Sequence, residues 1–275
     1  MGVDTLLENY AAGARDFRGI NLAHTDLSGM SLSYADFRRA NLVGANFQGA
    51  TLFCANLREA KLQNANLSNA DCRRANFMGA NLRNADLSSC LLLCAGMRSV
   101  DLANANLQGA KLGEVNLSEA TLDNANLSEA NLQDANLNRS KLMEANLTSA
   151  NMERAILTNA ILSGAALEYA NLTDAVLHGA SFEEANISHA ILNRVKAIGV
   201  NFMNAGLRET EIRNASLMWT SFRGANLEKA NLYRSKLHWV NFGETDLTEA
   251  VLISAELDEA NFYNASMNGT LMPDT

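Results

Sequence analysis

Proline is almost absent from this sequence, which has one proline, Pro273, in 275 residues, and aromatic residues make up only 6 %. Globular domains average about 5 % proline, much of it in loops, so this scarcity argues against a fold with many conventional loops. No apolar run approaches the roughly 18 residues of a membrane-spanning helix, and we expect no membrane segment. The N-terminus also lacks the basic and apolar regions of a secretory signal.

Cysteine is scarce as well, and the four Cys residues show no paired spacing. We therefore expect no disulfide framework and a cytoplasmic location. Positive charge is in the minority, since 22 Lys and Arg stand against 30 Asp and Glu, for a formal net charge of −8. Because nucleic-acid binding depends on positive charge, we expect no direct nucleic-acid binding.

The sequence is dominated instead by a five-residue repeat. From Phe17 to Met267, 51 positions at intervals of five form its centre, of which 35 are Leu and nine are Phe. Two residues before the centre, Ala occurs 36 times, and the residue between them is Asn or Asp 28 times. The unit is A-(N/D)-L-x-x, and its register never slips.

This period fits neither a helix nor a plain strand. In a helix, five residues advance about 140° beyond a full turn, which would scatter the Leu side chains around the axis. A strand needs apolar residues at intervals of two, whereas the spacing here alternates between two and three. The period favours a chain that is extended for two or three residues and then turns, with Leu and Ala facing inward.

The central phenylalanines predict how many repeats complete one coil. Five of them occur in succession at intervals of 20: Phe182, Phe202, Phe222, Phe242 and Phe262. Aromatic rings stack well on rings in the next layer of a sheet, so we expect 20 residues and four sides per coil. The 51 repeats then give about 13 coils.

These residues make the sequence resemble the pentapeptide repeat protein family over residues 15–269. The resemblance implies an all-β solenoid, a right-handed quadrilateral β-helix, and its handedness and square cross-section come from the family alone. The terminal segments are similar to cyanobacterial members, which implies a regulatory role in cyanobacterial cell differentiation. Some members imitate duplex DNA and bind DNA gyrase or topoisomerase. The resemblance therefore implies DNA mimicry as an alternative function.

The core of a solenoid is exposed at its ends unless another segment covers it. Leu6, Leu7 and Tyr10 form an apolar stripe, which predicts a short cap helix over residues 4–12. Asp4 is its expected N-cap, and Gly13 is expected to end it.

We divide the chain into an N-terminal cap (1–14), the repeat (15–269) and a C-terminal cap or tail (270–275). In the last segment, we expect Leu271 and Met272 to fold over the final coil.

One repeat is irregular, because Ala197 stands at a central position and Ile198 follows it. Either a bulge brings Ile198 inward, or the core has a thin layer there.

We find no candidate catalytic, cofactor-binding or metal-binding residues. The four histidines fall on three sides and in distant coils, and no motif for nucleophilic catalysis, phosphate binding or zinc binding is present. The cysteines are interpreted as small apolar residues in or near the core. The sequence therefore predicts a protein that is not an enzyme.

Charge is unevenly distributed over the four predicted sides. Three arginines stack in successive coils at one position: Arg18, Arg38 and Arg58. Asp16, Asp36 and Glu59 lie close enough to compensate their repulsion. This ladder is either a solvated surface or a docking strip for an acidic partner segment. A second side is acidic, with eight carboxylates and two basic residues: Asp26, Asp86, Glu129, Glu168, Glu209, Glu228, Asp246 and Glu249, with Arg208 and Lys229.

Beyond residue 150, the arginine-bearing side becomes apolar. The residues that make it so are Ile156, Val176, Ile198, Met218, Trp219, His238 and Trp239. The two tryptophans are 20 residues apart and are flanked by Lys196 and Lys236. Exposed aromatic residues are enriched at protein interfaces, but a stacked pair can also simply stabilise the wall. We predict an interaction scaffold that binds another protein and is a monomer or weakly self-associates through the two tryptophans.

Overall fold

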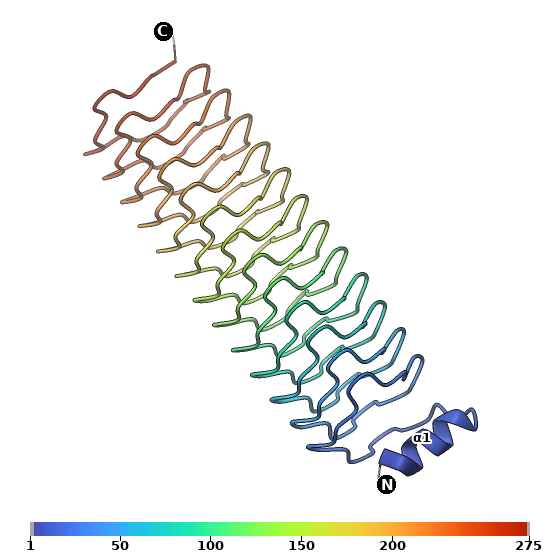
Figure 1. Cartoon of the computed structure of the whole chain (residues 1–275). Coiled ribbons are helices and arrows are strands. Elements are labelled where there is room, and N and C mark those ends of the chain that lie inside the picture. The colour runs from blue at the N-terminus through green and yellow to red at the C-terminus, as the bar shows by residue number, and fades with distance from the viewer. Residues whose placement is uncertain (1–2, 274–275) are drawn as a thin grey trace. The chain divides into compact units, whose positions relative to one another are not determined.

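The computed structural model describes residues 3–273 of the chain (Figure 1). The helix α1 comprises Val3–Ala11, and no other helix occurs in this range. From Asp16 onward, the chain winds into stacked coils of five-residue turns. These coils form two compact units, one ending at Asn136 and the other beginning at Leu137. At nine residues, α1 is too short to cross a membrane, and residues 3–273 contain no longer helix.

Within each unit, the coils are joined by parallel backbone pairing between residues 20 apart. In the first unit, Asp16 pairs with Asp36, and in the second, Ile156 pairs with Val176. The Phe17 N–H donates to the Asp36 carbonyl at 2.9 Å, and the Asp36 N–H donates to the Arg15 carbonyl at 2.7 Å. The same pattern recurs on all four sides, so the predicted 20-residue, four-sided coil is confirmed in each unit. The total of about 13 coils stays a prediction.

The core of each unit is built from the two inward positions of the repeat, as predicted, although Arg15 in the first repeat is exposed and Leu257 near the C-terminus is only half-buried. Leu107 and Ala110 in the first unit, and Leu167 and Ala170 in the second, have no exposed surface. The inward phenylalanines stack in columns. Ring centroids are 5.1, 5.0, 5.3 and 5.1 Å apart along the five-ring column of the second unit.

The Asn or Asp of the repeat closes the five-residue turn. Its side-chain oxygen accepts the N–H two residues later, as Asn126 does from Ser128 at 3.1 Å. In the same turn, the Ala130 N–H donates to the Leu127 carbonyl at 3.1 Å, and Glu129 between them has a φ of 59°. A positive φ at the third residue is the mark of a type II turn. The turn therefore explains why Asn and Asp are so frequent in the repeat.

Serine and threonine replace the inward alanine at several buried positions without leaving an unpaired hydroxyl. Thr220 donates to the Ala197 carbonyl at 2.9 Å, and Thr245 donates to the Phe222 carbonyl at 2.7 Å. A buried hydroxyl that is hydrogen-bonded avoids most of the cost of leaving water. These substitutions therefore keep the coil register intact.

Helix α1 contacts the first unit through its apolar residues. Leu6 is fully buried, and the Tyr10 hydroxyl donates to the Ser33 carbonyl at 3.0 Å. Gly13 has a φ of 96°, which suits the residue after a helix. The expected N-cap is wrong, because α1 begins at Val3 and places Asp4 in the first turn, where its charge favours the helix dipole.

The irregular repeat contains no bulge. Lys196 pairs with Val176 and with Ser216 in the normal register, and the Ala197 N–H donates to the Ser216 carbonyl at 2.7 Å. Ala197 is fully buried, whereas Ile198 is 41 % exposed. The core therefore has a thin layer at this coil.

The final described residues continue the last ladder. Leu271 pairs with Val251, its N–H donates to the Ala250 carbonyl at 2.9 Å, and it is 51 % exposed. The expectation that Leu271 folds over the last coil is therefore wrong, because backbone pairing holds it in register. Residues 274–275 lie outside the described residues, and the three-part division of the chain stays a prediction.

The phenylalanine column provides a test of how the core is held together. Phe202→Ala removes a fully buried ring that stacks on both neighbours. We expect it to lower the free energy of unfolding by about 3–5 kcal/mol, measured by urea denaturation followed by circular dichroism. Phe202→Leu, which restores the usual central residue, should cost less than about 1.5 kcal/mol. Equal losses for the two variants would contradict this expectation, because leucine would then recover none of the stability that the ring provides.

Candidate functional site

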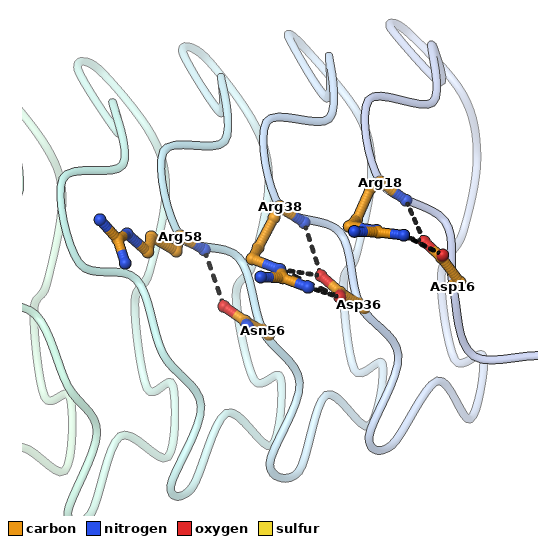
Figure 2. A network of polar contacts seen from close by, with 6 residues as sticks. All are labelled: Asp16, Arg18, Asp36, Arg38, Asn56 and Arg58. Atoms are coloured by element: carbon orange, nitrogen blue, oxygen red, sulfur yellow. Dashed lines mark hydrogen bonds and ion pairs between the residues drawn. The ribbon is translucent and has the colours of Figure 1, made fainter.

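The predicted arginine ladder is present in the first unit, and its first two members are tied to aspartates of their own coil. Arg18 Nε donates to Asp16 at 2.7 Å and its terminal nitrogen donates at 2.5 Å. Arg38 binds Asp36 in the same two-pronged way, at 2.9 and 2.6 Å. Figure 2 shows both side chains turned back onto their aspartates.

The third coil breaks this pattern. Asn56 replaces the aspartate and accepts only the Arg58 backbone N–H, at 3.3 Å, while the Arg58 side chain extends away from it (Figure 2). Arg58 Nε instead donates to one oxygen of Glu59 at 3.0 Å, and Arg39 Nε donates to the other at 2.7 Å. One carboxylate therefore serves two arginines.

These side chains surround a cleft of about 720 Å³, which we call the arginine cleft. It is lined by Asp16, Arg18, Gly19, Arg38, Arg39, Arg58 and Glu59. The first-coil end of the cleft is open, because a side chain at Gly19 would meet no atom within 4 Å.

The ion pairs shift the carboxylate pKa values as compensation requires. A hydrogen bond from Arg18 lowers the pKa of Asp16 to about 2. Hydrogen bonds from Arg38 and Arg39 lower the pKa of Asp36 and of Glu59, respectively. The predicted compensation of the ladder is therefore confirmed.

The Asp16 pKa gives a direct test of this geometry. A carboxylate whose pKa is lowered on folding favours the folded state above its ordinary pKa of 3.8, and this contribution is lost as the pH falls towards 2. We expect carbon NMR to show Asp16 titrating near pH 2, and Arg18→Ala to raise this pKa towards 3.8. Arg73→Ala, which removes a guanidinium bound to Asp71, is the control and should leave Asp16 unchanged. An Asp16 pKa near 3.8 in the unmodified protein would contradict the ion pair.

The second unit presents the predicted tryptophan pair. The Trp219 and Trp239 rings are stacked, with centroids 4.7 Å apart and planes 6° from parallel. They remain 60 % and 46 % exposed. The tryptophan patch is our name for this pair, His238 and the outward apolar residues on the same side of the second unit. Its members are Ile156, Val176, Ile198, Met218, Trp219, His238 and Trp239.

The backbone at both tryptophans is in the left-handed region, with φ values of 60° at Trp219 and 55° at Trp239. Bulky residues rarely adopt this conformation. In the coil before Trp219, the equivalent residue is Gly199, where a side chain would meet nothing within 4 Å. The ring face of Trp219 that points away from Trp239 therefore borders open space.

Acidic residues of the next coil hold His238 beside the pair. Its ring nitrogens lie 2.8 Å from a Glu256 oxygen and 3.0 Å from an Asp258 oxygen. The His238 and Trp239 ring centroids are 6.0 Å apart. The structure thus brings the tryptophans and His238 together. Ile156 and Val176 pair with each other in a backbone ladder of the second unit that continues through Lys196, Ser216 and Lys236.

Sequence reasoning missed two side-chain arrangements. It did not foresee that Arg39 and Arg58 share Glu59. It also missed the stacked rings of Tyr169 and His189, whose centroids are 4.9 Å apart. The 20-residue spacing of the latter pair would have revealed it.

The cysteines and acidic residues form no metal-binding group of three or more within residues 3–273. All four cysteines are free thiols. Cys90 donates to the Ala70 carbonyl at 3.2 Å, and its hydrogen bond with Cys72, together with burial, raises the pKa of the Cys72 thiol. These two buried cysteines fit the interpretation as core residues.

Five-residue turns, 20-residue coils and a Leu/Ala core define a repeat protein of the β-helix class. The family model for pentapeptide repeats matches most of the chain, over residues 16–52, 55–92, 101–139, 122–159, 160–196, 201–238 and 231–272. The chain belongs to the pentapeptide repeat family. The fold of that family, the right-handed quadrilateral β-helix, agrees with the four-sided coils of each unit.

Several solved structures of pentapeptide repeat proteins are similar to the chain. HetL of the cyanobacterium Nostoc sp. strain PCC 7120, a protein involved in heterocyst differentiation regulation, is 33 % identical, with 100 % of this chain and 98 % of HetL covered and a TM-score of 0.34. A thylakoid-lumen protein of Arabidopsis thaliana is 37 % identical over 37 % of this chain and 71 % of its own, with a TM-score of 0.36.

QnrB1, a plasmid-mediated fluoroquinolone resistance protein, is 15 % identical over 74 % of this chain and 90 % of its own, with a TM-score of 0.30. No curated protein sequence matches.

Proposed function

We propose that this protein is a cytoplasmic, non-enzymatic scaffold that binds another protein through the tryptophan patch. The observation that carries the proposal is the exposed, stacked pair of Trp219 and Trp239. Tryptophan is among the residues most enriched where binding energy concentrates in protein interfaces. A stacked pair is also rigid, so little side-chain freedom is lost when a partner covers it.

A role in stabilising the wall explains the pair less well. Both tryptophans sit at turn positions with positive φ, where glycine or asparagine would be less strained. Much of each ring also stays in contact with water. A pair that served only the wall would gain more stability from burying these rings than from leaving them in water.

The wider role that we propose is regulation, by occupying a contact surface of the partner. A sequence identity of 33 % to HetL over the full chain supports a role in cyanobacterial cell differentiation. The protein acts as a monomer, or as a weak self-associating species that uses the same tryptophan pair.

DNA mimicry with gyrase or topoisomerase as the partner is the alternative, and the acidic side favours it. That side is partly neutralised, however, since Arg208 lies 3.3 Å from both Glu209 and Glu228. Duplex DNA carries about one charge per 1.7 Å, a density that such a side does not reach.

The double variant Trp219→Ala, Trp239→Ala tests the proposal. Because both side chains are largely exposed, we expect the circular dichroism spectrum to be unchanged and the thermal midpoint to stay within a few degrees. We expect capture of the partner from the native lysate, identified by mass spectrometry, to fall at least tenfold. Tyr263→Ala, which removes an aromatic residue that is 69 % exposed elsewhere in the second unit, is the matched control and should retain capture. Undiminished capture by the double variant would reject the tryptophan patch as the binding surface.

A supercoiling assay separates the two functions. As a scaffold for a different partner, the protein is expected to leave DNA gyrase activity and its quinolone sensitivity unchanged at equimolar concentration. Inhibition or protection at substoichiometric concentration would establish the alternative instead.

A further inference from the structure

The arginine cleft has donors that the protein itself does not use. Arg39 and Arg58 both direct Nε at Glu59, and within residues 3–273 their terminal guanidinium nitrogens have no partner. The side chains are 77 % and 48 % exposed. Each therefore presents the outer edge of its guanidinium group to solvent, in the geometry that binds a carboxylate through two hydrogen bonds.

The cluster also has one more positive than negative charge. Four arginines surround the cleft, whereas the carboxylates that pair with them are Asp16, Asp36 and Glu59. In the following coil, the equivalent positions are Met78 and Gly79, which carry no charge. Like charges in adjacent coils, about 4.8 Å apart, repel, so an additional carboxylate would be attracted here.

We propose that the arginine cleft is a docking site for an acidic segment of a protein partner, whose carboxylates bind Arg39 and Arg58. This site is separate from the tryptophan patch and rests on the proposed function only in that the partner is a protein.

An extended peptide fits the spacing of these donors. Alternate side chains of an extended segment lie on one side, about 6.8 Å apart. Arg39 and Arg58 belong to adjacent coils, so their flexible side chains can reach two such carboxylates at once. The open space at Gly19 leaves room for the segment to continue.

Nucleic acid suits the cleft less well than an acidic peptide does. The surplus is a single positive charge within a protein of net charge −8, and many closely spaced phosphates would be repelled by the remaining surface. Two or three carboxylates on an otherwise neutral segment match the cleft without this cost.

The test is the binding of a fluorescein-labelled peptide of four Glu-Gly repeats to the full-length protein, measured by anisotropy. We expect saturable binding that weakens as salt is raised. A peptide of four Lys-Gly repeats should not bind. Absence of binding by the Glu-Gly peptide at millimolar protein concentration would overturn the proposal. The proposal would also be overturned if a labelled 20-base-pair DNA duplex bound more tightly than the peptide and the double variant Arg39→Gln, Arg58→Gln abolished that binding.

Two variants and a matched control locate the site. Arg39→Gln with Arg58→Gln should weaken peptide binding at least tenfold. Arg73→Gln should leave it unchanged, because Arg73 is an exposed arginine of the same unit that is already bound to its own Asp71. If the double variant and the control weakened peptide binding equally, the loss would follow from the change in net charge alone, and the proposal would be overturned.

Asn56→Asp is the most specific test. It places an aspartate where Asp16 and Asp36 stand in the preceding coils, and it can still accept the Arg58 backbone N–H. We expect the new carboxylate to bind Nε and one terminal nitrogen of Arg58, as Asp16 and Asp36 bind Arg18 and Arg38. Arg58 then loses a free terminal nitrogen, so peptide binding should fall about tenfold with the thermal midpoint unchanged. Undiminished binding would show that Arg58 is not a donor to the ligand.

The two proposals fail independently. The Trp219→Ala, Trp239→Ala variant should bind the Glu-Gly peptide with unchanged affinity. Loss of peptide binding in this variant would overturn the assignment to the arginine cleft. If this variant still binds the peptide and still captures the protein partner, the arginine cleft is supported and the tryptophan patch is rejected.

Discussion

The parallel backbone pairing of residues 20 apart is the constraint on which the rest of each unit depends. It can repeat without interruption because the third residue of every five-residue turn has a positive φ. Where the repeat carries Asn or Asp, as at Asn126, that side chain also accepts a backbone N–H. Once this register is set, each outward residue lies directly against its counterpart in the next coil. Side chains therefore interact mainly as ladders, and a ladder's effect on stability depends on which residue type is repeated.

The ladders differ in what they contribute. Stacked phenylalanines are buried, so the contact between rings and the removal of apolar surface from water both favour folding. Stacked arginines repel, and the first two are kept in place by an aspartate in their own coil. Stacked tryptophans gain ring contact but remain exposed and occupy a strained turn position. At the two candidate sites, a ladder thus departs from what stability alone would favour, which is typical of functional positions.

The features that follow from the register could be predicted from sequence. The 20-residue coil, the inward Leu and Ala positions, and the adjacency of Trp219 and Trp239 all result from counting residues. The features that depend on side-chain rotamers or on local backbone choices could not. The sharing of Glu59 between Arg39 and Arg58 requires the direction of three flexible side chains, and the thin core layer at Ala197 required a decision between two backbone paths that the sequence left equal.

The architecture of each unit favours binding at its surface. Catalytic groups are most effective where water is excluded, whereas the arginines of the arginine cleft and the tryptophans of the tryptophan patch remain exposed. Binding instead gains from surfaces that are already ordered, because less conformational entropy is lost on association. In each unit, backbone pairing fixes the outward residues before any partner arrives. A partner that presents an aromatic group or carboxylates at the spacing of adjacent coils would therefore find its contacts already in place.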